Sequence, residues 1–217
     1  PLTLAEQLQA NHLQLPGAPG HQPFAAWQAG VADVPSAWLT PCHVQLGMDR
    51  AQLHDPEGLQ LGEAESRALM DALAPLWADE GVTLRYVSPL RWLAQGDWLR
   101  DAHGISLAQA ARGMLQHTQL TPEVPTQSAA TRARLLRLHN EVEMLLYTHP
   151  VTDARAAQRL PAVNAIWLHG AGLLPAADAA TVAQRVPGVR VDTRLAEAAD
   201  QGGPAAWQAT WQALQPE

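Results

Sequence analysis

Two long segments with helical periodicity, each followed by short apolar segments, constrain the fold of this chain more than any other feature. Residues 62–77 and 129–147 place apolar side chains three or four positions apart, so each segment predicts a helix with one apolar face. After the second helix, "AVNAIWLHG" predicts a strand, "DAATVAQRV" a helix and "VRVDTR" another strand. This alternation is typical of an α/β fold, or a mixed α+β fold, with a central, partly parallel sheet and flanking helices.

Shorter patterns complete the secondary structure. They predict a short helix at 3–9, a β-hairpin over 42–55, two strands around Pro89, a helix at 106–115, a polar loop at 117–128 and a last amphipathic helix at 203–215. No internal repeat is visible. We expect one domain over 1–217, and residue 128 is the expected boundary if there are two lobes.

Composition excludes several classes of protein. The single cysteine, Cys42, excludes an intramolecular disulfide framework, and no apolar run is long enough to cross a membrane. The net charge is −7 and the 14 basic residues, all arginine, are scattered, which disfavours nucleic-acid binding. We expect a cytoplasmic protein without a membrane partner. Because Pro1 is not an initiator methionine, we also expect chain to be missing at one or both ends.

The metal-ligating and nucleophilic residue types form no strong motif. Cys42 and His43 are neighbours on a predicted strand, where side chains alternate between faces, so they are badly placed to share a proton. The nine histidines show no zinc-ligand spacing, and we expect neither a metal nor a cofactor. His139 and Glu143 are one helical turn apart and form a candidate polar pair. His149 precedes Pro150, where an imidazolium would complement the carboxyl end of the long helix.

Asn164 is a polar residue within an apolar strand, and Gly170-Ala171-Gly172 follows it. A buried Asn amide needs hydrogen-bond partners, so Asn164 either ties two loops together or contacts a ligand. The glycines allow a close approach to the backbone, although no helix opens directly after them as in a phosphate loop. Because open α/β sheets bind ligands beside strand ends, we favour a ligand site at Asn164, Gly170 and Gly172.

Four segments carry a family resemblance: "LTPCHVQLGMDRAQLHDPEGLQLGEAESRAL", "LRWLAQGD", "LHNEVEMLLYTHPVTDAR" and "LPAVNAIWLHGAG". They resemble the RpfE-type bacterial proteins, whose members are described as regulatory proteins or as cofactor-independent phosphoglycerate mutase-like proteins. The resemblance runs from about Ala37 to Gly172 and weakens toward the C-terminus. It implies a mutase-like fold.

The resemblance does not extend to the mutase chemistry. Phosphoryl transfer in that superfamily uses two metal ions, held by Asp and His clusters, and a Ser or Thr nucleophile. This sequence lacks the Asp-Gly and Asp-His clusters. Of the matched motifs, only Arg91 remains as a candidate phosphate-binding arginine, and we place it beside Asn164, Gly170 and Gly172.

These observations lead to three hypotheses. The first is a non-catalytic regulatory or binding protein of the RpfE type, whose inherited cleft holds a small anion or a protein segment. The alternative is a phosphoglycerate mutase-like or phosphatase-like enzyme that depends on metal. The third is a structural interaction module, for which Trp207 and Trp211 would supply an exposed apolar patch. In the first, Asn164 and Arg91 share one ligand, so their substitutions are expected to affect binding non-additively.

Overall fold

The computed structural model describes residues 2–18, 21–48, 50–112, 114–116, 128–185 and 208–213. Its elements in chain order are α1 (Leu4–Leu13), α2 (Phe24–Ala29), β1 (Ser36–Cys42), β2 (Val44–Leu46), β3 (Arg50–Leu53), the 3₁₀ helix η1 (Pro56–Leu59), α3 (Glu63–Asp79), β4 (Thr83–Ser88), β5 (Arg91–Gln95), the 3₁₀ helix η2 (Asp97–Asp101), α4 (Leu107–Ala111), β6 (Met114–Gln116), α5 (Ala129–Tyr147), α6 (Pro150–Ala157), β7 (Ala165–Gly172) and α7 (Ala176–Arg185).

The chain divides into two compact units, residues 1–184 and 185–217. In the second unit, residues 208–213 are helical, within the helix expected at 203–215. The strand expected at "VRVDTR" and most of the polar loop at 117–128 lie outside the described residues. The boundary expected near residue 128 stays a prediction. None of the helices in the described ranges combines the length and the hydrophobicity that crossing a membrane requires.

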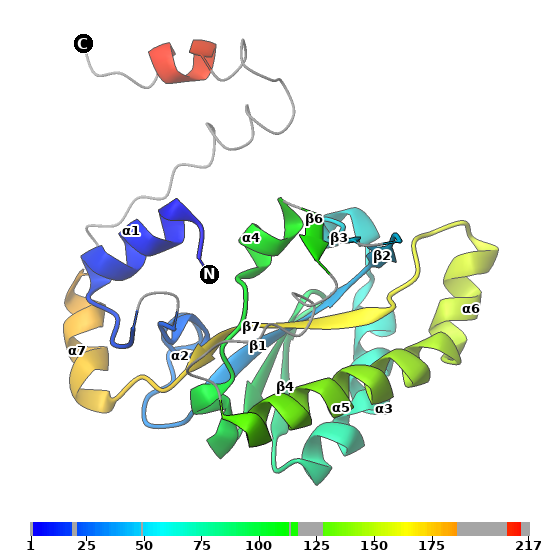
Figure 1. The fold of residues 1–217 in the computed structure, drawn as a ribbon, viewed down its shortest axis with the longest axis horizontal. Helices are drawn as coiled ribbons and strands as arrows, with labels where there is room; N and C mark the ends of the chain where they lie inside the picture. The colour runs from blue at the N-terminus through cyan, green and yellow to red at the C-terminus, as the bar shows by residue number, and fades with distance from the viewer. Residues whose placement is uncertain are drawn as a thin grey trace. The chain divides into compact units, whose positions relative to one another are not determined.

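The mixed α/β fold class is confirmed. The central sheet has the strand order β4-β5-β1-β7 (Figure 1). Its described neighbours are all antiparallel, so the expectation of parallel pairing is wrong for these strands. The reason is the position of β1: β5 and β7 run in the same direction, as a helical crossover requires, but β1 lies between them and opposes both.

The predicted hairpin at 42–55 is confirmed, because β2 and β3 pair antiparallel. With β6 they form a second sheet, of order β2-β3-β6. The helix expected at 106–115 is shorter than predicted: α4 ends at Ala111, and residues 114–116 pair with β3 instead. Strand pairing across a long sequence separation here overrides a weak local helical pattern.

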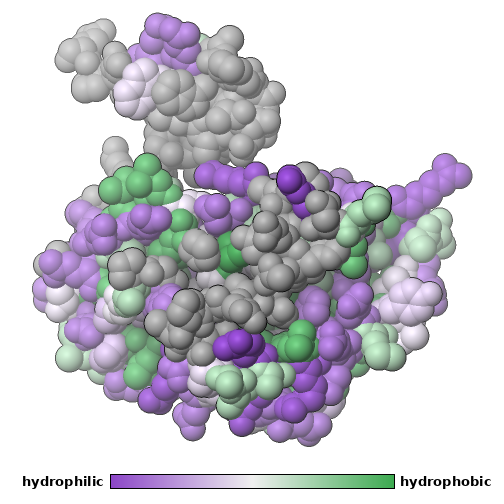
Figure 2. Space-filling model, viewed as in Figure 1, coloured by the Kyte–Doolittle hydropathy of each residue, from purple (hydrophilic) through white to green (hydrophobic). Residues whose placement is uncertain are grey.

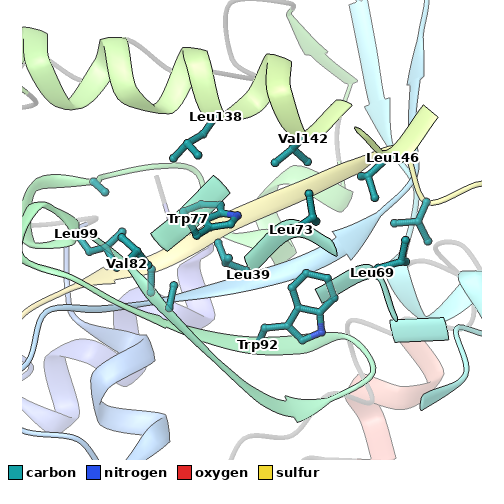
Figure 3. Close-up of a cluster of buried hydrophobic side chains, with 14 of the residues drawn as sticks. Leu39, Leu69, Leu73, Trp77, Val82, Trp92, Leu99, Leu138, Val142 and Leu146 are labelled. Atoms are coloured by element: carbon teal, nitrogen blue, oxygen red, sulfur yellow. The ribbon is translucent and has the colours of Figure 1, made fainter. Parts of the chain in front are cut away.

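The helices predicted at 62–77 and 129–147 are confirmed as α3 and α5, which contact each other and cover one face of the central sheet (Figure 1). Their apolar faces meet the β1 and β5 side chains in one cluster (Figure 3). Leu39 and Trp92 are fully buried in it. Some buried polar atoms there are paired: the Trp92 indole donates to Ser66 Oγ (2.9 Å) and Ser66 donates to the Pro89 carbonyl (2.7 Å). The Trp77 indole nitrogen and the Tyr86 hydroxyl are buried without a hydrogen-bond partner among the described residues.

The opposite face of the central sheet is only partly covered by apolar packing. Trp38 and Leu93 pack there against Ala25 of α2. Side chains two positions away on the same strands lie on the same face, because strand side chains alternate. These are Thr40 on β1 and Arg91 on β5.

His149 caps a helix, but not the one expected. Pro150 does not simply end α5: it occupies the first turn of a new helix, α6. The His149 Nδ1 atom accepts a hydrogen bond from the Val151 amide at 3.2 Å, which places this imidazole at an amino end. Pro is favoured in the first turn because the N–H groups of that turn have no helical acceptor, so a residue without an N–H loses no hydrogen bond there.

The exposed surface is mixed in polarity. Figure 2 shows hydrophobic residues in separate groups among hydrophilic ones over the described part of one face. Trp211 is 45% exposed, while Trp207 lies outside the described residues. An interaction patch at these two tryptophans therefore stays a prediction.

Candidate functional site

Arg91 lies at the start of β5, on the face of the central sheet that α3 and α5 leave uncovered. The β1–β5 ladder pairs Leu39 with Trp92, so the next position of the ladder brings Arg91 beside Thr40. The Arg91 guanidinium carbon lies 5.1 Å from the centre of the Trp38 ring, which confirms that the two side chains share a face. The site begins with an arginine held over a buried aromatic ring.

Thr40 and His169 form a polar pair next to this arginine. His169 lies opposite Trp38 in the β1–β7 ladder, so it shares a face with Thr40, two residues along. Thr40 Oγ1 and His169 Nε2 are hydrogen-bonded at 3.0 Å, and Thr40 is 2% exposed. Burial, and then the charge of Arg91, lower the pKa of His169 to about 3, so the imidazole is neutral at pH 7.

One hollow of about 180 Å³ joins these groups. Its remaining walls come from the β4–β5 hairpin, the start of η1, and α4, through Ser88, Leu90, Asp55, Pro56, Glu57 and Leu107. The volume is below the range of pockets that enclose drug-sized ligands. The hollow therefore suits a molecule of only a few non-hydrogen atoms.

Arg91 lines this hollow and forms no ion pair within the described residues. Arg67, Arg134 and Arg155 each form an ion pair with a glutamate, at 2.8–3.2 Å. Within the described part of the chain, Arg91 contacts the Trp38 ring and forms neither an ion pair nor a hydrogen bond. A guanidinium that lines a hollow without a partner favours a bound anion, since its N–H groups can hold a carboxylate or phosphate at two points.

Asn164 lies elsewhere, and its amide is already hydrogen-bonded. Its Oδ1 atom accepts from the Val44 amide and its Nδ2 atom donates to the Val44 carbonyl, each at 2.8 Å. The Asn164 backbone amide donates to the Cys42 carbonyl at 3.2 Å. These bonds tie the start of β7 to the junction of β1 and β2, which is the loop-tying role.

Gly170 and Gly172 lie at the other end of β7, which at the rise of a strand is about 20 Å and about 26 Å from Asn164. Gly170, with φ of +63°, provides the extra residue in a β-bulge between Ser36 and Trp38 of β1. A Cβ atom at Gly170 would approach the Ala25 amide nitrogen to 3.2 Å, and one at Gly172 would approach Pro23 to 3.0 Å. The glycines thus allow β7 to contact the start of α2.

The four residues expected to share one ligand are therefore not brought together. Asn164 binds the Val44 backbone, and the two glycines contact α2. Gly172 also borders a separate hollow that includes His21, His103 and Arg100. The rings of His21 and His103 stack there at 3.8 Å. Only Arg91 of the four lies in the hollow with the Thr40 and His169 pair.

His139 and Glu143 are both on α5, but no hydrogen bond or ion pair joins them among the described contacts. His139 lines a mainly apolar hollow between α5 and β7, together with Trp77, Val142 and Trp167. Glu143 is exposed. The polar pair stays a prediction.

No three His, Cys, Asp or Glu side chains in the described ranges gather closely enough to hold a metal ion. The rings of His43 and His54 lie 5.2 Å apart at the ends of the β2–β3 hairpin. His43 Nδ1 bonds to the Ala162 carbonyl at 2.9 Å, and His54 Nε2 to Gln45 Oε1 at 3.1 Å.

Sequence reasoning missed Thr40, Ser88 and His169. The strand containing Thr40 was not expected, because Pro41 interrupts the apolar pattern of β1. His169 carried a usable signal: it is a polar residue two positions after Trp167 in an apolar strand, which places it on one defined face. The partner of that face depends on strand order, which the sequence pattern does not contain.

No family model matches this chain, and no curated protein does. Among solved structures, a cofactor-independent phosphoglycerate mutase from Thermoplasma acidophilum DSM 1728 is 16% identical, with a TM-score of 0.47, over 78% of this chain and 47% of that one. The PH0037 protein from Pyrococcus horikoshii is 14% identical, with a TM-score of 0.43, over 85% and 46%. This chain thus spans about half the length of each. The similarity is distant, and the RpfE-type resemblance stays a prediction.

Proposed function

We propose that this chain is a non-catalytic binding protein that holds a small anion in the hollow of Arg91, Thr40, Ser88 and His169. The observation that carries the proposal is the absence of a counter-ion for Arg91 within the described residues, although it lines the hollow. Arg91 is exposed, and its contact with the Trp38 ring reduces the side-chain freedom that it loses on binding. The anion supplies the missing charge.

The neighbouring hydroxyl groups fit this function. Thr40 and Ser88 line the hollow beside Arg91. Ser88 can donate to anion oxygens, and Thr40 can do so in the tautomer in which His169 Nε2 donates to Thr40 Oγ1. His169 is neutral, so it adds a hydrogen-bonding group without adding charge. Such a site favours a carboxylate or a phosphate over an apolar ligand or a protein segment, because Arg91, Thr40, Ser88 and His169 are all polar.

The Thr40 and His169 pair also has the form of a nucleophile and a base, which is the observation that favours the enzymatic alternative. The chemistry argues against that reading. A general base works best when its pKa lies near the working pH, whereas the pKa of His169 is lowered to about 3. An imidazole so weakly basic accepts the Thr40 proton poorly. We therefore expect no turnover of 3-phosphoglycerate, with or without added manganese or cobalt.

The test is isothermal titration calorimetry with phosphate, acetate and succinate at constant ionic strength. We expect measurable binding of at least one anion to the wild type, and a loss of roughly tenfold or more in Arg91→Gln, because a charge-assisted hydrogen bond is removed. Arg85→Gln is the matched control, since Arg85 is an exposed arginine of the neighbouring strand β4 and does not line the hollow. Equal affinities in the wild type and Arg91→Gln would refute the proposal.

The regulatory role implied by the family resemblance would require that the anion-bound and anion-free forms of the protein interact differently with another molecule. Limited proteolysis with and without the anion tests this, because a ligand that orders part of the chain changes the cleavage pattern. An unchanged pattern at saturating anion would leave a binding function without regulation.

A further inference from the structure

The hollow that contains Arg91 also contains charge of the opposite sign. Asp55 and Glu57 line it from the start of η1, while Arg91 lines it from β5. No ion pair joins either carboxylate to Arg91 within the described part of the chain. The Asp55 Oδ1 atom accepts a hydrogen bond from the Glu57 amide at 3.1 Å, which fixes this carboxylate in place as the cap of η1.

From this arrangement we infer that the ligand is a small amino-carboxylate zwitterion, bound by its acid group at Arg91 and by its ammonium group at Asp55 and Glu57. The inference rests on the proposed anion-binding function and names the class of anion. A simple anion would satisfy Arg91 but would be repelled by the two carboxylates. A simple amine would meet the reverse problem. A molecule with both charges satisfies all three side chains at once.

The exposure of the lining residues supports the same reading. Thr40 is buried and the neutral His169 is half-buried, and they supply hydrogen-bonding groups without a formal charge. The charged side chains, Asp55, Glu57 and Arg91, are exposed and come from separate elements, η1 and β5. The short carbon chain that separates an ammonium from a carboxylate carries no charge of its own.

Size narrows the class further. A hollow of about 180 Å³ is too small for a nucleotide or a peptide segment, since pockets for drug-sized ligands begin at roughly 300 Å³. The walls combine charged and neutral polar side chains with the apolar Pro56, Leu90 and Leu107. Amino acids with small side chains, or short ω-amino acids, meet these limits.

The experiment is calorimetric titration of the full chain with glycine, β-alanine, 4-aminobutanoate and 6-aminohexanoate. Each is compared with the carboxylate and the amine of the same chain length. We expect at least one amino acid to bind roughly tenfold or more tightly than both of its single-charge analogues, because it gains a charge-assisted contact that each analogue lacks.

Removing either carboxylate should change the affinities for amino acids and for simple carboxylates in opposite directions. In Glu57→Gln, and in Asp55→Asn, which keeps a capping side chain, amino-acid affinity should fall several-fold while simple carboxylates bind more tightly, because a repulsive charge is gone. In Arg91→Gln, both ligand types should bind more weakly. Glu141→Gln, an exposed position on α5 outside the hollow, is the matched control and should change neither.

The possible results separate the two proposals. If simple carboxylates bind in an Arg91-dependent way and amino acids bind no better, the zwitterion is refuted while anion binding stands. If no anion or amino acid binds the wild type, both proposals fail. Tight, Arg91-dependent binding of an amino acid that Glu57→Gln weakens supports both.

Discussion

Cys42 and Thr40 lie two residues apart on the same face of β1, and their side chains meet different surroundings. Cys42 is fully buried among apolar side chains, and its Sγ atom contacts the Ala165 carbonyl at 3.5 Å. Thr40 is equally buried but bonds to His169 beside a hollow. The surroundings of these two side chains therefore depend on which residues the neighbouring strand places beside them, and not only on their own positions in the sequence.

Cys42 is expected to be inert to thiol reagents in the folded protein. Burial raises the pKa of its thiol to about 12, so almost no reactive thiolate is present at pH 8. A chromogenic disulfide reagent should label the native protein negligibly within an hour and label it fully in denaturant. The native reaction should also show no step between pH 7 and pH 10. Rapid native labelling would contradict the burial of this residue.

Asn164→Ala is expected to destabilise the protein without weakening anion binding. The substitution leaves the Val44 amide and carbonyl without their side-chain partner, at a cost of roughly 1–3 kcal/mol in the free energy of unfolding. Urea unfolding measures the loss, and calorimetry on the folded protein measures the affinity. Asn140→Ala, on the exposed side of α5, is the control. A loss of affinity at full stability would return Asn164 to the binding site.

His169 is expected to make the folded protein sensitive to acid. Its folded pKa is about 3, below the ordinary 6.5, so the unfolded chain binds an extra proton between these values. The stability it contributes is complete above pH 6.5 and is lost as the pH falls toward 3. From pH 7 to pH 5 the free energy of unfolding should fall by roughly 1–2 kcal/mol more in the wild type than in His169→Gln. Parallel pH profiles of the two proteins would exclude this effect.

At the scale of elements, the sequence predicts helices and strands that depend on near neighbours, and it does not predict those that depend on distant contacts. The bounds of α5 follow from its apolar periodicity and from Ser128 at its amino end, so the sequence predicts them. Helix α6 was not predicted, because its anchor, Arg155, is a charged residue in a short helix. Arg155 is fully buried, and it donates to the Pro161 carbonyl and to Glu65, both at 2.9 Å. No pattern within α6 reveals these partners.

Arg155→Ala is therefore expected to be strongly destabilising. The guanidinium joins α6 to α3 through Glu65 and to η1 through the Leu59 carbonyl. Removing one partner of a buried ion pair typically costs about 3–5 kcal/mol. Denaturant unfolding should show a loss near the lower end, because Glu65 is partly exposed and can be hydrated, while Arg85→Ala should change little. A loss below 1 kcal/mol would mean that α6 is held by other contacts.

At the scale of the first unit, the hollow unites residues that are far apart in the sequence. Thr40, Glu57, Arg91 and His169 come from four elements, and they meet because β1 lies between β5 and β7. The sequence predicts most of the helices, the hairpins and β7, since these depend on near neighbours. It cannot predict the insertion of β1, because antiparallel and parallel orders bury the same apolar strand faces. The site expected from the sequence was therefore placed on residues that are close together in the chain, Asn164 to Gly172. Of the residues that line the Arg91 hollow, only Arg91 itself was expected.

The residues up to 185 are expected to fold without the rest of the chain. Every described member of the apolar clusters that contain Leu39, Cys42 and Trp38 belongs to the first unit, residues 1–184, and so does every residue lining the Arg91 hollow. Residue 185 completes α7, which contributes the buried Val182. Because burial of these clusters supplies most of the stabilisation, a chain ending at 185 should unfold in one cooperative transition with a midpoint within a few degrees of the full chain. Circular dichroism melting measures both midpoints, and anion titration of the shortened chain tests the hollow. A non-cooperative melt would show that residues 186–217 contribute to the stability of the first unit.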